Sequence, residues 1–261
     1  MKKRGQATVF IILGIVLVII VALYIVGTQT RIIPPLLGGG SAQEQMGEVD
    51  EHITECLENI GSQYVTQLAL QGGYLSIPAD SYKLYNDTQV SYLCYNQLNS
   101  PTCSNRMLTI PHMEQELEDT ISSALETCIN VQDYSSDLTG LGESWVLEVD
   151  ILQSGVDLTL TYPVEITQDE QIITQEEFSY VIDAPLGELY DVTIDIVNSE
   201  ASVGDFDQLI YMLQKFSKYT IYKYKPYPDK IYQVRLREGD FIFQFAIQGE
   251  ELVWKSFNFF Y

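Results

Sequence analysis

Four cysteines are the residues whose type and spacing carry the clearest chemistry in this chain. They are Cys56, Cys94, Cys103 and Cys128. An even number of cysteines in a secreted or surface domain is typical of disulfide bonds, and three pairings are possible. The favoured pairing joins Cys94 with Cys103 across a short loop and Cys56 with Cys128 across a long one. A zinc site is the competing interpretation, but the spacing lacks a C-x₂-C pair and a histidine companion.

No recognised arrangement of catalytic residues occurs in the sequence. It contains no G-x-S-x-G, no H-E-x-x-H, no phosphate-binding glycine loop and no EF-hand pattern. The two histidines, His52 and His112, favour ordinary surface or helix-capping roles, so we expect no metal site and no cofactor. Carboxylates are abundant, which keeps a carboxylate-based hydrolase of the envelope as an alternative. The favoured expectation is a protein that is not an enzyme.

The charge of the chain excludes nucleic acid as a partner. The sequence has 14 Lys and Arg against 36 Asp and Glu, a formal net charge of -22. Between Arg106 and Lys215 there is no basic residue but there are 23 acidic ones. A phosphate backbone is repelled by such a surface because its binding depends on Lys and Arg. Basic residues return after Lys215, with eight of them in residues 215–255.

Asn86 begins the tripeptide Asn86-Asp87-Thr88, which fits the N-glycosylation sequon. The tripeptide lies in a polar stretch that we expect to be an exposed loop. Asn86 is therefore a possible glycosylation site if this part of the chain is outside the cell.

The uncharged run from Val9 to Val26 predicts a membrane-spanning helix. Its 18 residues span roughly the 30 Å hydrocarbon core at 1.5 Å rise per residue. Lys2, Lys3 and Arg4 precede the run and place the N-terminus in the cytoplasm by the positive-inside bias. We expect a single-pass protein of the cell membrane, bound to the lipid bilayer through residues 9–26, with its ectodomain outside. A cleaved secretory signal is the alternative.

The segment from Lys3 to Thr8, followed directly by the apolar run, resembles the class III signal peptide of archaeal type IV pilin-like proteins. This resemblance implies cleavage between Gly5 and Gln6 and a filament core made by the apolar helix. Phe10 stands where those pilins carry Glu. The sequence PPLLGGGSAQ at 34–43 also interrupts the helix that a pilin continues into its head.

The chain as a whole more closely resembles an uncharacterised group of N-terminally anchored surface proteins of small-genome archaea. The resemblance rests on the N-terminus, on a Cys-Leu helix that ends in Leu70-Gln71-Gly72-Gly73-Tyr74, and on a second helix that ends in Cys128. It implies a surface location and carries no known activity.

Hydrophobic periodicity predicts the elements that position the cysteines. Apolar residues recur every three or four positions over 42–71, which predicts a helix ended by Gly72-Gly73, and again over a second helix from Pro111 to Cys128. Cys56 and Cys128 fall on the two buried stripes, so a bond between them would clamp the helices. A tyrosine-rich loop is expected between the helices.

After Gly142 the apolar period changes from helical to two, which predicts strands. Two further helices are expected at 186–197 and 206–216, the second with Asp205 and Asp207 as its cap and first-turn acid; a weak calcium site is the alternative there. The expected strands are 145–153, 156–164, 165–174, 178–182, 219–224, 231–237, 241–248 and 252–259.

These elements together predict an α+β protein with four segments. They are a membrane anchor at 1–33, a flexible linker at 34–43, a helical part with the cysteines at 44–135, and an α+β part with antiparallel strands at 143–261. The expected function is that of a non-enzymatic, membrane-anchored surface module that binds a surface protein or a glycan. The alternative is a pilin-like subunit of a surface filament, which would be an oligomer.

Overall fold

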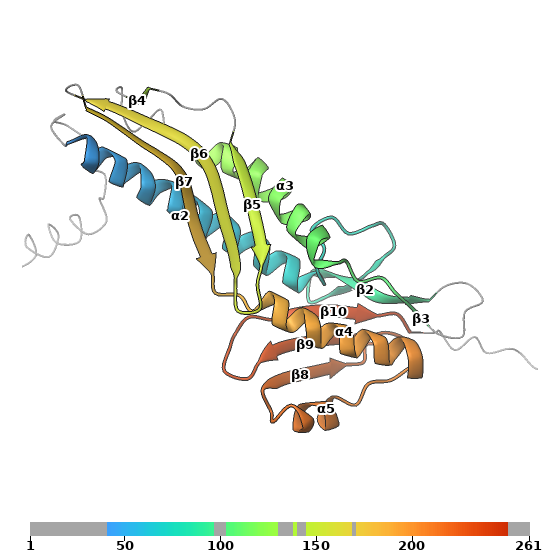
Figure 1. Cartoon of the computed structure of the whole chain (residues 1–261). Helices are drawn as coiled ribbons and strands as arrows, with labels where there is room; N and C mark the ends of the chain where they lie inside the picture. The colour runs from blue at the N-terminus through green and yellow to red at the C-terminus, as the bar shows by residue number, and fades with distance from the viewer. Residues whose placement is uncertain (1–40, 97–102, 130–137, 140–144, 169–170, 250–261) are drawn as a thin grey trace, which may run out of the picture. The chain divides into compact units, whose positions relative to one another are not determined.

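The computed structural model describes residues 41–96, 103–129, 138–139, 145–168 and 171–249 (Figure 1). Ser41–Tyr261 forms one compact unit. The predicted anchor, most of the linker, the Gly5 and Gln6 processing site and the strand expected at 252–259 lie outside the described residues. In the part that is described, no helix is both long and apolar enough to cross a membrane.

The N-terminal half contains two long helices, which confirms the prediction made from its apolar periodicity. Helix α2 spans Ala42–Leu70, and its buried side chains follow one stripe along its length. It ends where Gly72 and Gly73 take positive φ angles, a conformation that glycine adopts without a steric penalty. Helix α3 spans Ile110–Cys128, with proline in its first turn as expected.

A six-stranded sheet joins the segment between these helices to the C-terminal segment. Its strand order is β1-β2-β10-β9-β8, with β3 also paired to β2. All pairs are antiparallel except β10 with β2, which is parallel. The bounds are β1 Tyr82–Tyr85, β2 Thr88–Asn96, β3 Cys103–Asn105, β8 Tyr219–Tyr224, β9 Lys230–Leu236 and β10 Phe243–Ile247.

The prediction of a loop between the two helices is wrong, because strands β1, β2 and β3 lie there. Asn86 and Asp87 have positive φ angles of 48° and 62° and form the two-residue turn of the β1–β2 hairpin. Asn and Asp tolerate this conformation better than most residues, which makes the turn compatible with the pair. The expectation of purely antiparallel strands fails at the β2–β10 pair.

A second sheet has four strands and a twisted outer face (Figure 1). Its long strands β6 and β7 pair along their lengths, β5 pairs with the first half of β6, and β4 with the second half. The prediction of a single strand at 165–174 is wrong, because β6 ends at Gln168 and β7 begins at Gln171. The bounds are β4 Leu138–Thr139, β5 Val146–Ile151, β6 Val156–Gln168 and β7 Gln171–Ile182.

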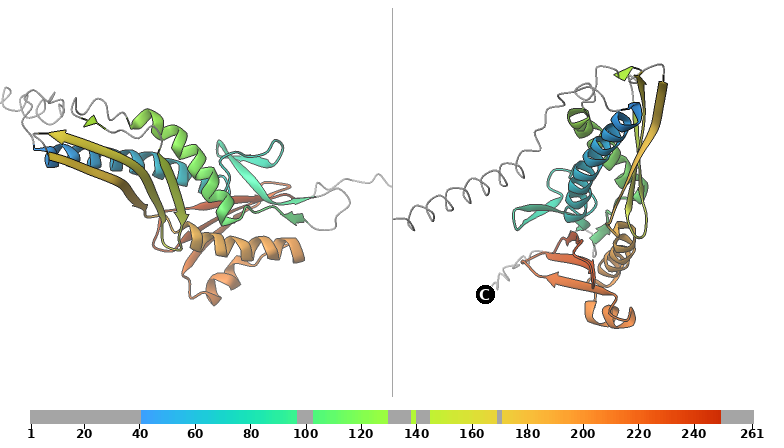
Figure 2. Two further views of the ribbon diagram at one scale, coloured as in Figure 1. Left: turned by 45° about the horizontal axis from the view of Figure 1, so that its top comes forward. Right: turned by 90° about the vertical axis from the view of Figure 1, so that its left-hand side faces the viewer.

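Helices α2 and α3 lie together on one side of β5, β6 and β7 (Figure 2). Packing is closest at Gly61, where an added Cβ would come within 2.4 Å of Leu158 Cδ1 on β6. Helix α3 also covers the edge of β5, because the Glu118 and Glu114 carboxylates accept the backbone N–H groups of Val149 and Ile151 at 3.2 and 2.9 Å.

Helix α4, Leu186–Val203, crosses β9 and β10 and buries one face against the six-stranded sheet (Figure 1). The short helix α5, Gln208–Gln214, follows it and contacts β8. The buried side chains of α2, α3, α4 and both sheets form one continuous core. The described part is therefore α+β with four helices, as the sequence predicts.

Two disulfides fix this arrangement, with the pairing that the sequence favours. Cys56–Cys128 joins α2 to α3 with Cα atoms 6.0 Å apart, and Cys94–Cys103 joins β2 to β3. His52 lies beside the first bond, with its Nε2 3.1 Å from the Cys128 carbonyl oxygen. Its role is therefore structural, because it supports the C-terminal end of α3.

Removing the two disulfides should destabilise the protein unequally. The Cys56–Cys128 bond closes a separation of 72 residues and the Cys94–Cys103 bond one of 9. Loop-closure entropy predicts losses of about 4 kcal/mol for Cys56→Ala with Cys128→Ala, and of about 3 kcal/mol for Cys94→Ala with Cys103→Ala. Denaturant unfolding of both double variants measures these losses. A larger loss from the short loop would contradict this account.

Candidate functional site

Four large apolar side chains on and just after α5 face the solvent. None of the residues of α5 is buried, although the sequence pattern predicted a helix with an inward stripe. Leu213 is 72 % exposed and Phe216 is 96 % exposed. A contiguous group of exposed apolar side chains of this kind is typical of an interaction surface. We call Leu209, Ile210, Leu213 and Phe216 the α5 surface.

Two side chains on the other side of α5 hold the helix to the domain. Tyr211 and Met212 are partly buried and pack against the core. The Tyr211 hydroxyl donates to Asp195 of α4 at 2.7 Å, and the Ile221 N–H of β8 points to the Met212 sulfur at 3.3 Å. The helix is therefore fixed by these contacts, and the α5 surface is left without a partner in the described part of the chain.

The start of α5 is set by a cap and a buried ring. One carboxylate oxygen of Asp207 accepts the backbone N–H groups of Leu209 and Ile210 at 3.1 and 3.0 Å, so Asp207 is the N-cap, two residues after the cap that the sequence predicted at Asp205. Phe206 is 6 % exposed and contacts the rings of Tyr211 and Tyr232. Thus the chain enters α5 in a fixed direction.

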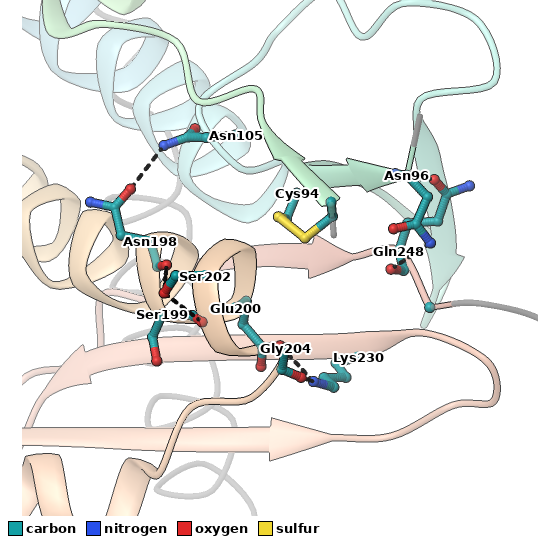
Figure 3. The surroundings of a disulfide bond; sticks show 12 residues. Cys94, Asn96, Asn105, Asn198, Ser199, Glu200, Ser202, Gly204, Lys230 and Gln248 are labelled. Atoms are coloured by element: carbon teal, nitrogen blue, oxygen red, sulfur yellow. Dashed lines mark hydrogen bonds and ion pairs between the residues drawn. A yellow bond between two sulfur atoms is a disulfide. The ribbon is translucent and has the colours of Figure 1, made fainter. Parts of the chain in front are cut away.

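A buried ionic network holds the chain between α4 and α5 in place. Glu200, near the end of α4, is 2 % exposed and accepts from Lys230 at 2.5 Å and from the Tyr232 hydroxyl. Lys230 also donates to the Gly204 carbonyl at 2.7 Å (Figure 3). Lys223 donates to Asp205 and, at 2.9 Å, to the carbonyl of the following residue. Burial, with the hydrogen bond to Glu200, raises the pKa of Tyr232.

Phe216 ends α5 in an unusual backbone conformation. Phe216 and Ser217 have φ angles of 52° and 55°, in the left-handed region that costs a residue with a side chain about 1 kcal/mol or more. The Ser217 N–H donates to the Met212 carbonyl at 2.8 Å, which closes the turn. The Phe216 ring is 96 % exposed and therefore adds little to the packing of the described residues.

Two exposed basic side chains, Lys215 and Arg237, border the α5 surface. Residues 205–240 contain seven Lys or Arg and five Asp or Glu, a net charge of +2 in a chain of -22. Lys215 and Arg237 are exposed, and within the described residues neither forms an ion pair. Arg237, Leu209 and Leu213 line a shallow groove of about 460 Å³ beside β8. The surface therefore combines aliphatic contact area with positive charge.

Comparison with known proteins adds no relative. No family model, no curated protein and no solved structure matches this chain. Its function must therefore be argued from its own residues.

The structure brings the other candidate residues predicted from the sequence into no common site. The two disulfides lie in different elements, and Asn86 lies exposed at the tip of the β1–β2 hairpin, where glycosylation stays a prediction. Gly5 and Gln6 lie outside the described residues. Asp205, which was expected to cap the helix, binds Lys223 and Lys230 instead. Across the described ranges, no group of three or more His, Cys, Asp or Glu could hold a metal ion.

The α5 surface was missed because its apolar spacing looks like that of a buried stripe. One signal could have found it. The stripe coincides with the return of basic residues at Lys215 after a stretch of more than a hundred residues without any. Helix α5 itself contains no basic residue, so the signal is an apolar helix followed directly by Lys215.

Asp205→Asn should weaken the fold in a pH-dependent way. The hydrogen bond from Lys223 lowers the pKa of Asp205 to about 2. The charged carboxylate therefore adds stability above its unfolded pKa of about 3.9, and this is lost as the pH falls through about 2. Because the side chain is 64 % exposed, we expect a loss of at most about 1 kcal/mol at pH 7. Urea unfolding should show the difference shrinking between pH 5 and 2; an equal difference at both would contradict the ionic origin.

Phe216→Gly should leave the fold as stable as the wild type or raise the unfolding free energy by up to about 1 kcal/mol. Glycine relieves the left-handed strain and removes no packed side chain. Phe206→Ala, ten residues earlier, is the control and should cost about 3 kcal/mol or more because that ring is buried. Denaturant unfolding measures both. A large loss in Phe216→Gly would mean that the ring packs in the folded protein.

Proposed function

We propose that this chain is a non-enzymatic module of the cell surface that binds a partner protein through the α5 surface. The exposure of Leu213 and Phe216 on a helix whose other side is firmly packed carries the proposal. Burial of a few aliphatic and aromatic anchors supplies most of the energy in protein interfaces. The proposed partner surface combines apolar and acidic groups, because Lys215 and Arg237 border the apolar side chains of the α5 surface.

In this proposal the module is anchored in the cell membrane and its described domain lies outside. The uncharged run at 9–26 and the basic residues before it support the anchor. The two disulfides support an oxidising location, since such bonds persist in secreted and surface proteins. The sequence offers no nucleophile near a base, which supports binding as the role in place of catalysis.

A photo-crosslinking phenylalanine derivative in place of Phe216 tests this function in the native membrane. The derivative is nearly isosteric with the residue that it replaces, so the full-length chain should fold normally. Irradiation should give a protein adduct of discrete mass. The same derivative in place of Leu84, which is 62 % exposed on β1, is the matched control and should give none. Absence of an adduct at Phe216, or adducts with lipid alone, would overturn the proposal.

A further inference from the structure

The outer face of the four-stranded sheet is the second large unpartnered surface of the domain. Helices α2 and α3 cover the inner face, and no described element covers the outer one (Figure 2). The strand registers place three rows of three residues on this outer face. We call it the acidic sheet face: Val146, Thr161 and Glu177; Glu148, Thr159 and Ser179; Asp150, Asp157 and Val181.

The acidic sheet face carries four carboxylates and no basic residue. Asp150 lies directly opposite Asp157 across the β5–β6 pair, and like charges in that position repel each other. One carboxylate oxygen of Asp157 is hidden from solvent and has no hydrogen-bond donor within the described part of the chain. A cation supplied from outside the domain would relieve this repulsion.

Apolar area accompanies these carboxylates. Val146 and Val181 are each 59 % exposed at opposite corners of the acidic sheet face. The face is therefore apolar and acidic, which is the chemistry that the α5 surface requires of its partner. The α5 surface in turn supplies apolar side chains and the exposed cations of Lys215 and Arg237.

We infer that the partner of the α5 surface is the acidic sheet face of a second copy of this chain. The inference rests on the proposed function, whose partner it names. The two surfaces lie on different sheets, α5 beside β8 and the other on β5, β6 and β7, so one copy offers α5 while its neighbour offers the sheet. Such a contact is heterologous, and each added copy leaves both kinds of surface free at the ends. Anchored copies would thus form head-to-tail rows.

The test uses the full-length chain in nanodiscs that hold one copy each, measured by light scattering after size-exclusion chromatography. The wild type should form dimers and longer species as its concentration rises, and added salt should weaken them because the contact pairs opposite charges. Leu213→Glu with Lys215→Glu disables the α5 surface. Asp150→Lys with Val181→Lys disables the acidic sheet face. Each double variant alone should associate at least about tenfold more weakly than the wild type.

Mixing the two double variants distinguishes this contact from a symmetric one. The first retains an intact acidic sheet face and the second an intact α5 surface, so the mixture should form dimers but nothing larger. Leu84→Glu, an exposed apolar-to-acidic change outside both surfaces, should associate like the wild type. Circular dichroism and thermal unfolding check that all variants are folded.

Three outcomes would overturn the inference. They are a wild type that stays monomeric, a sheet-face variant that associates normally, and a mixture that stays monomeric. The identity of the Phe216 adduct separates this inference from the proposed function. If mass spectrometry finds residues of β5–β7 in the adduct, the partner is a second copy. If the adduct contains a different protein, the inference is wrong and the proposed function is still supported.

Discussion

The fold depends on the continuous apolar stripe of α2, because both sheets pack against this one helix. The helix contacts β6 and β7 of the four-stranded sheet and β10 of the six-stranded sheet. At its end the Gln244 side chain of β10 donates to the Leu70 carbonyl at 3.1 Å. The contact at Gly61 and the disulfide at Cys56 fix the rotation of the helix, since turning it would drive backbone into Leu158 or break the bond.

Sequence periodicity was sufficient for the elements whose partners are close in the chain. A local apolar pattern indicates which side is buried in each of these elements. They are helices α2 and α3, the hairpin of β5 and β6, and strands β8 to β10. Strands β1 and β3 are short, and the five consecutive buried residues of β2 follow neither a helical period nor a period of two. Strand β2 pairs in parallel with β10, about 150 residues later, and no local pattern contains that pairing.

The candidate site shows a different limit of sequence reasoning. The period of apolar residues along a helix indicates which side chains share one face. It does not indicate whether another element covers that face. Phe206 belongs to the same apparent stripe as Leu213, yet only Phe206 is buried, because it precedes the helix and fits between Tyr211 and Tyr232. Long-range contacts decide the difference. The disulfide pairing, in contrast, could be inferred because both helical cysteines fall on buried stripes.

The carboxylates of Glu114 and Glu118 have a consequence for how such chains can meet. They occupy backbone N–H groups along the edge of β5 that would otherwise be open to a strand from another molecule. Addition of a strand from another molecule at this edge of β5 is thereby discouraged. At this edge another molecule is left to meet side chains, in contacts that can form and dissolve without any exchange of backbone hydrogen bonds.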